Sequence, residues 1–273
     1  MAKRRGANGG RGLLLYAIFY LAFLYVPVLF LPLFSFNDSA FIAFPLTGFT
    51  TKWYAQLFAD SAVRQALANS LKVGAAAALI STMLGIPAAK ALTRYRVPGG
   101  GAVLAFVNIP LFVPEIVLGI SLLILLNVAE IPLSLMTVVL GHIVFCIPFA
   151  ITVLMSRMDG FDTSLEEASL DLGETPWMTF WRVTFPLALP GIVSSLLLTF
   201  MVSFDDFLVA YFLAGTDTTL PIYIWGSLRF PAQLPKVLAL GALILVVSTI
   251  LVVVAEWIRS LGVEQGRRPM VGA

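Results

Sequence analysis

The chain offers few side chains that could catalyse a reaction, because its 273 residues include one cysteine and one histidine. His142 and Cys146 stand four positions apart in an apolar stretch, a spacing that places both on one face of a helix. A Cys–His pair can act as nucleophile and base, but such pairs normally have a third, orienting residue, and none stands nearby in the sequence. We therefore predict packing roles for both residues, no catalytic residue and no metal site.

Three acidic residues fall within long apolar stretches: Glu115, Asp205 and Asp206. Acids at membrane depth are costly and usually face a bundle interior or a water-filled cavity. No Lys or Arg stands near the middle of these stretches, so the carboxylates would favour a cationic solute. Neighbours on a helix point about 100° apart, so Asp205 and Asp206 are expected to differ in role. One would line a pathway, while the other bonds a neighbouring helix or a partner chain. The alternative is that these acids only hold helices together.

Composition shows what surrounds these residues. Hydrophobic residues make up 59% of the chain and charged residues 12%, whereas an average soluble domain carries roughly 25% charge. The apolar residues form blocks of about the 20 residues that a helix needs to cross a bilayer. We therefore predict an all-α integral membrane bundle of about six transmembrane helices, near residues 13–36, 69–92, 103–127, 133–156, 190–213 and 237–257.

The first of these stretches follows basic residues, as in a secretory signal, but it exceeds the usual apolar length of about 7–15 residues. We expect an uncleaved helix, bent near Pro27 and Pro32. Basic residues also predict orientation, because cytoplasmic loops carry an excess of Lys and Arg. With both termini in the cytoplasm, the outer side holds five of the 17 basic residues, and the inner side holds Lys3, Arg4, Arg5, Arg11, Lys90, Arg94, Arg96, Arg157, Arg182, Arg259, Arg267 and Arg268.

The most polar stretch of the chain, residues 157–182, predicts a helix–turn–helix in the cytoplasm. Asp162, Thr163 and Ser164 are suited to cap a helix, and the dipole of that helix would favour acids in its first turn. Gly173 suits a left-handed residue after the helix, and Pro176 suits the first position of the next one. On this second helix, three aromatic residues are expected to share a face: Trp177, Phe180 and Trp181.

The amino-acid sequence of this loop resembles the EAA motif of ABC importer permeases. The motif reads roughly E-A-A, three residues, Gly, and about ten residues later a hydrophobic residue followed by Pro. Here it corresponds to the segment from Glu167 to Gly173, followed by Phe185 and Pro186. Two positions depart from the pattern, since Ser169 replaces an Ala and Phe185 replaces the usual Leu. The resemblance implies a loop that couples to an ATPase, with residues Glu166, Glu167, Ala168, Ser169, Asp171, Gly173 and Pro186.

Further segments resemble the PotC/PotI-type permeases of bacterial spermidine/putrescine importers: residues 114–119, 203–207 and 218–221. The resemblance covers nearly the whole chain. It implies a type I ABC importer permease fold, with residues 1–273 as a single transmembrane domain and residues 157–189 as its coupling loop. It also implies a multi-pass subunit of the bacterial inner membrane that forms a polyamine pathway by alternating access.

The same resemblance implies the partners. They are a second, related permease, a dimer of cytoplasmic ATPases, and a periplasmic binding protein that delivers the substrate. The chain has no G-x-x-x-x-G-K-[ST] phosphate loop, and the run Gly99-Gly100-Gly101 lacks the Lys that such a loop requires. We therefore expect no cofactor on this chain, with ATP and Mg on the ATPase subunits. The net charge of +2 gives no indication of nucleic acid.

Three other functions remain open from the sequence. The first is an ABC permease for another small solute, such as an amino-acid derivative, an opine or an organophosphonate. The second is an ATP-independent carrier or channel, which predicts inverted repeats or paired broken helices. The third is an intramembrane hydrolase, which needs a nucleophile and base or a metal cluster. The single His and single Cys argue against the third, and the polar loop is unexplained by the second.

Overall fold

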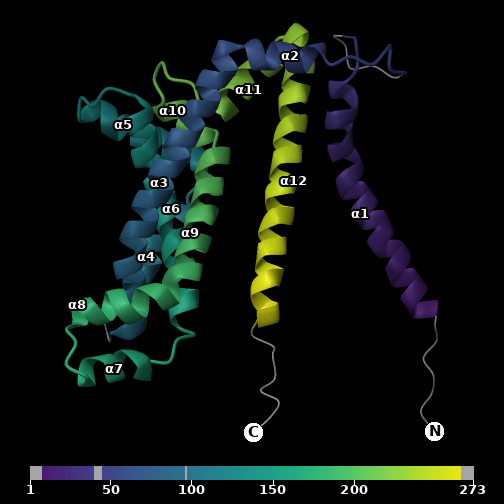
Figure 1. The fold of residues 1–273 in the computed structure, drawn as a ribbon. Coiled ribbons are helices and arrows are strands. Elements are labelled where there is room, and N and C mark those ends of the chain that lie inside the picture. Colours follow the sequence, from purple (N-terminus) through teal and green to yellow (C-terminus); the bar gives the residue numbers. More distant parts are fainter. Residues whose placement is uncertain (1–7, 40–44, 96, 266–273) are drawn as a thin grey trace. The chain divides into compact units, whose positions relative to one another are not determined.

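A computed structural model describes residues 8–39, 45–95 and 97–265, with side chains placed for residues 12–39, 45–95 and 97–250. These residues form helices and one isolated antiparallel bridge between Asn37 and Phe49, so the predicted all-α class is confirmed (Figure 1). Several residues used to predict orientation lie outside the described parts: Lys3, Arg4, Arg5, Arg96, Arg267 and Arg268, together with the side chains of Arg11 and Arg259.

Five helical segments of the described chain are long and apolar enough to cross a membrane, and a bent helix pair raises the number to six. This agrees with the six stretches expected from the sequence. The long helices are α1 (Asn8–Ser35), α3 (Ser61–Arg94), α6 (Leu135–Met158), α9 (Phe185–Asp205) and α12 (Leu234–Gln265). The bent pair is α4 (Gly100–Phe112) and α5 (Glu115–Val128).

The chain divides into two compact units, which are described separately. The terminal unit comprises residues 1–61 and 224–273, and the central unit comprises Ala62–Tyr223. In the terminal unit, α1 packs against α12, and Gly241 of α12 faces the side chain of Leu31. One boundary between the units follows Ser61, the first residue of α3, and the other falls within α11 (Leu220–Leu228).

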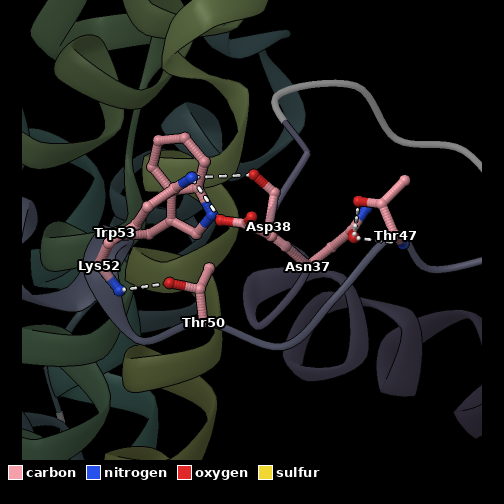
Figure 2. Close-up of polar contacts among 6 residues, drawn as sticks. All are labelled: Asn37, Asp38, Thr47, Thr50, Lys52 and Trp53. Atoms are coloured by element: carbon pink, nitrogen blue, oxygen red, sulfur yellow. Dashed lines mark hydrogen bonds and ion pairs between the residues drawn. The ribbon is translucent and has the colours of Figure 1, made fainter.

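Within the terminal unit, the described residues that follow α1 make polar contacts with one another and with the start of α2 (Lys52–Ala59) (Figure 2). The indole N–H of Trp53 donates to the backbone oxygen of Asn37 at 2.7 Å, and the Asn37 side chain accepts from the backbone N–H of Thr47. Lys52 Nζ lies 2.5 Å from Asp38 Oδ1. Trp53 is 8% exposed, and its buried indole N–H satisfies the backbone carbonyl of Asn37, two residues beyond the end of α1.

The central unit is built around α6, which packs against α4, α9 and α10 (Leu208–Leu213). Glycines allow close approach between these helices, as is usual in membrane bundles. A Cβ atom added at Gly141 of α6 would lie 2.5 Å from Leu213 Cδ1, and one added at Gly119 of α5 would lie 2.8 Å from Phe212 Cδ2. The apolar core here includes Val138, Cys146, Val209 and Leu213, so the packing role predicted for Cys146 is confirmed.

The prediction of a single straight helix over residues 103–127 is wrong. It breaks between α4 and α5 with a bend of 99°. Pro114 causes the break, because the residue before a proline is pushed out of the helical region. Val113 accordingly has ψ 129°, and Pro114 itself has ψ 131°.

The helix expected over residues 190–213 is also corrected at both ends. It begins at α8 (Pro176–Thr179) and passes through a π-helical segment, Phe180–Thr184, into α9. The wider π turn accommodates Pro186, which has no N–H to donate and crowds the preceding turn. At the other end the helix stops at Asp205, because Asp206 takes an extended conformation, and α10 then starts at Leu208.

Candidate functional site

The polar loop forms two short helices at one end of the central unit, while α5 and α10 lie at the opposite end (Figure 1). The first short helix is α7 (Ser164–Asp171), and Asp162 Oδ1 accepts a hydrogen bond from the backbone N–H of Ser164 at 3.0 Å. This bond lowers the pKa of Asp162, because it favours the charged carboxylate. Its contribution to α7 is thus fully present at neutral pH and is lost only as pH falls through the lowered pKa.

The turn between the short helices has the predicted chemistry. Gly173 has φ +90°, a left-handed conformation that glycine adopts without strain. The Thr175 hydroxyl then accepts from the backbone N–H of Met178, which caps α8. Glu174 pairs with Arg182, so an ion pair closes the loop on itself.

Polar contacts hold α7 against the rest of the central unit. Glu166 Oε1 accepts a hydrogen bond of 2.8 Å from the hydroxyl of Thr184, in the π-helical segment. The same oxygen lies 3.6 Å from Nε of Arg94, the last residue of α3. About one helical turn further along α7, the Ser169 hydroxyl shares a hydrogen bond of 3.0 Å with the hydroxyl of Thr179.

The predicted coupling residues therefore divide into two groups. Glu166 and Ser169 bond inward, whereas Glu167, Ala168, Asp171, Gly173 and Pro186 are exposed. The outward surface also carries apolar side chains, since Leu172 is 87% exposed and Trp177 is 67% exposed. A polar helix that displays large apolar groups is typical of a surface that another protein covers.

The aromatic residues of the second short helix cluster as expected. The ring centroids of Trp177 and Trp181 are 5.7 Å apart, and those of Phe180 and Trp181 are 5.2 Å apart. Phe185 extends the cluster into α9, with its ring centroid 4.9 Å from that of Trp181. The cluster stiffens the connection between the loop and the long helix.

At the break between α9 and α10, the structure joins one of the predicted acids to the single histidine. Asp206 Oδ2 lies 3.1 Å from His142 Nε2 and accepts from the backbone N–H of Ala210 at 2.9 Å. His142 Nδ1 shares a hydrogen bond of 2.6 Å with the hydroxyl of Ser203. The Asp206 carboxylate thus ties α6 to α9 and satisfies an N–H at the start of α10.

Ser203, His142 and Asp206 are the residue types of a hydrolytic triad, but their surroundings argue for a structural role. Ser203 is 3% exposed and His142 is 1% exposed, while the Asp206 side chain is 5% exposed. A nucleophilic serine must reach a substrate, and this hydroxyl is closed off by packed helices. The packing role predicted for His142 is therefore incomplete, because its ring also makes these two polar contacts.

The other two predicted acids are not brought into this cluster. Asp205 is exposed at the last residue of α9, and Glu115 is exposed at the first residue of α5. Each stands beside a helix break, but at opposite helix ends. The N-terminal dipole of α5 stabilises the Glu115 carboxylate, whereas the free carbonyls at the C-terminus of α9 add to the negative potential around Asp205.

Comparisons with known proteins show what the whole chain is similar to. Residues 81–260 match the family model for the binding-protein-dependent transport system inner membrane component. The putrescine transport system permease protein PotI of Escherichia coli K12 is 36% identical over 231 residues, covering 82% of each chain. The spermidine/putrescine permease protein PotC of the same organism is 35% identical over 238 residues, which is 87% of this chain and 89% of that protein.

A solved structure shows the same fold. A chain of a bacterial ABC transporter involved in the import of the acidic polysaccharide alginate superposes with a TM-score of 0.72 at 16% identity. The match covers 95% of this chain and 98% of that one. The type I permease fold that the sequence predicted is therefore confirmed.

The contacts of Asp206 lead to a first prediction. Replacing His142 with Ala leaves the buried Asp206 carboxylate short of a partner, and H142A is expected to lower the free energy of unfolding by about 1–3 kcal/mol. Thermal unfolding of the purified chain in detergent measures this. D205N is the matched control, because the exposed side chain next in sequence should change stability by less than about 0.5 kcal/mol. Equal losses in H142A and D205N would contradict the assignment.

Proposed function

Because this chain belongs to the family of binding-protein-dependent transport system inner membrane components, we propose that it is a permease subunit of an ATP-driven polyamine importer. The observation that carries the polyamine assignment is the similarity to PotI and PotC over more than four-fifths of the chain. The chain would form the translocation pathway with a second permease and alternate between outward and inward openings.

The exposed surface of α7 supports the proposed partnership with an ATPase. Glu167 and Asp171 present charge, and Leu172 presents an apolar group. Such a mixed surface suits docking in a groove of a separate protein. ATP and Mg would bind on the ATPase dimer, and movement of the dimer would push or pull α7. A periplasmic binding protein would deliver substrate at the opposite end of the bundle.

This role also sets the orientation in the membrane. The ATPases are cytoplasmic in the proposed importer, so the loop of residues 157–189 would face the cytoplasm. The excess of basic residues predicted for that side supports the same orientation, in which both termini would be cytoplasmic.

Of the acids beside the helix breaks, Asp205 is best suited to contact a cationic substrate. Asp206 Oδ2 contacts His142 and the backbone of α10, and its side chain is 5% exposed. Asp205 combines an exposed carboxylate with the negative end of the α9 dipole. An ammonium group of a polyamine carries the opposite charge.

The proposed substrate is tested by uptake of labelled spermidine and putrescine in cells from which this gene has been deleted and then restored. Unlabelled polyamines, neutral amino acids and an organophosphonate serve as competitors. We expect deletion to abolish uptake, restoration to recover it, and only polyamines to compete. Unchanged polyamine uptake after deletion would refute the polyamine assignment. Competition by another of these solutes would identify the substrate class instead.

The role of Asp205 is tested by the same uptake assay in D205N. Loss of one charged contact costs about 1.5–3 kcal/mol. The substrate concentration that gives half-maximal uptake should therefore rise by at least about tenfold. D159N is the matched control, because Asp159 is also exposed but follows α6 at the end of the unit that carries α7. Wild-type uptake in D205N, at a normal amount of protein in the membrane, would remove Asp205 from the pathway.

A further inference from the structure

Arg94 occupies an unusual position at the end of α3. Its side chain is 9% exposed, and its guanidinium carbon lies 6.0 Å from the ring centroid of Phe161. Among the described residues, Nε and Nη2 of Arg94 are buried without a hydrogen-bond partner. The ion pair that the described residues show for Arg94 is with Glu166 of α7, at 3.6 Å. A buried guanidinium with so few partners is costly to keep, so its placement calls for a specific role.

The attachment of α7 makes this contact important. The helix has eight residues, and none of them is buried. Apolar packing therefore does little to fix α7 to the bundle, and its hold depends on a few polar contacts. Two of them converge on one atom, Glu166 Oε1, which meets Arg94 from α3 and Thr184 from the segment that leads into α9.

The charges around this junction single out the Arg94–Glu166 pair. Arg157 also contacts the ring of Phe161, with its guanidinium carbon 5.2 Å from the ring centroid. Lys90 Nζ lies 5.1 Å from the ring centroid of Phe180. Both of these cations contact aromatic rings. Arg94 is the one among them for which an ion pair to α7 is found in the described part of the chain.

We propose that Arg94 is a positioning residue for energy coupling, which rests on the proposed function. Through Glu166 it ties α7 to α3, while Thr184 ties the same carboxylate to α9. A displacement of α7 by the ATPases is thereby delivered to two long helices together. Without Arg94, α7 can move while α3 stays in place.

The 3.6 Å separation leaves room for the contact to tighten. It exceeds the usual length of a charge-assisted N–H···O bond, and two nitrogens of Arg94, Nε and Nη2, have no acceptor among the described residues. A small shift of α7 toward α3 would let the Glu166 carboxylate accept hydrogen bonds from both nitrogens. The junction therefore favours a closer position of α7, which the force from the ATPases can select.

The test uses the complete importer, reconstituted in proteoliposomes with its second permease, ATPases and binding protein. Two quantities are measured per assembled complex: polyamine uptake, and the ratio of substrate-stimulated to basal ATP hydrolysis. In R94Q and E166Q we expect both to fall by at least about fivefold, the lower range of typical coupling energies. K90Q is the matched control, because it removes a cation of α3 that contacts only an aromatic ring in the described structure.

A double variant distinguishes a shared junction from two separate defects. If Arg94 acts through Glu166, R94Q/E166Q should lose no more coupling than either single variant. Additive losses would overturn the proposal, and so would normal uptake per assembled complex in R94Q, even where less complex assembles. The wild-type importer separates the two levels of inference: if it shows no polyamine-stimulated ATP hydrolysis, the proposed function itself fails.

Discussion

A helix that breaks at membrane depth leaves backbone N–H and C=O groups that lipid cannot satisfy, so the protein must supply their partners. The chain meets this constraint at the break between α9 and α10 with the Asp206 carboxylate, which accepts from the N–H of Ala210. That carboxylate in turn needs its own partner, and His142 of α6 supplies it. Ser203, His142 and Asp206 thus form a buried polar cluster that joins α6 to the end of α9.

This constraint divides the two adjacent aspartates. Asp206 is committed to holding the break, and the break in turn places Asp205 at the exposed end of α9. At the other end of the unit, α7 is held by polar contacts and not by core packing. A rigid interior and a lightly attached outer helix suit a protein whose movements are driven from outside the membrane, since interfaces with few contacts are the ones that shift at low cost.

Much of this arrangement could be predicted from the sequence because it rests on local patterns. Apolar blocks predicted the spans, and the residues Asp162, Gly173 and Pro176 predicted the two short helices, since caps and turns depend on a few neighbouring residues. The helix breaks after Phe112 and Asp205 were not predicted, because the residue types at Pro114 and Asp206, proline and aspartate, also occur inside continuous helices. The pairing of Asp206 with His142, and of Arg94 with Glu166, joins residues more than 60 positions apart, and spacing alone does not reveal such contacts.

In the proposed importer, α7 is the surface through which ATP hydrolysis reaches the membrane helices. The most direct measurement is photo-crosslinking from position 172, whose leucine is 87% exposed, in membranes that contain the whole importer. Position 106 of α4, where the Phe side chain is 74% exposed, is the matched control on an apolar helix. We expect a product between position 172 and an ATP-binding subunit, identified by mass spectrometry, and none from position 106. Labelling of position 172 by a membrane-impermeant reagent from the periplasmic side, with no such product, would contradict it.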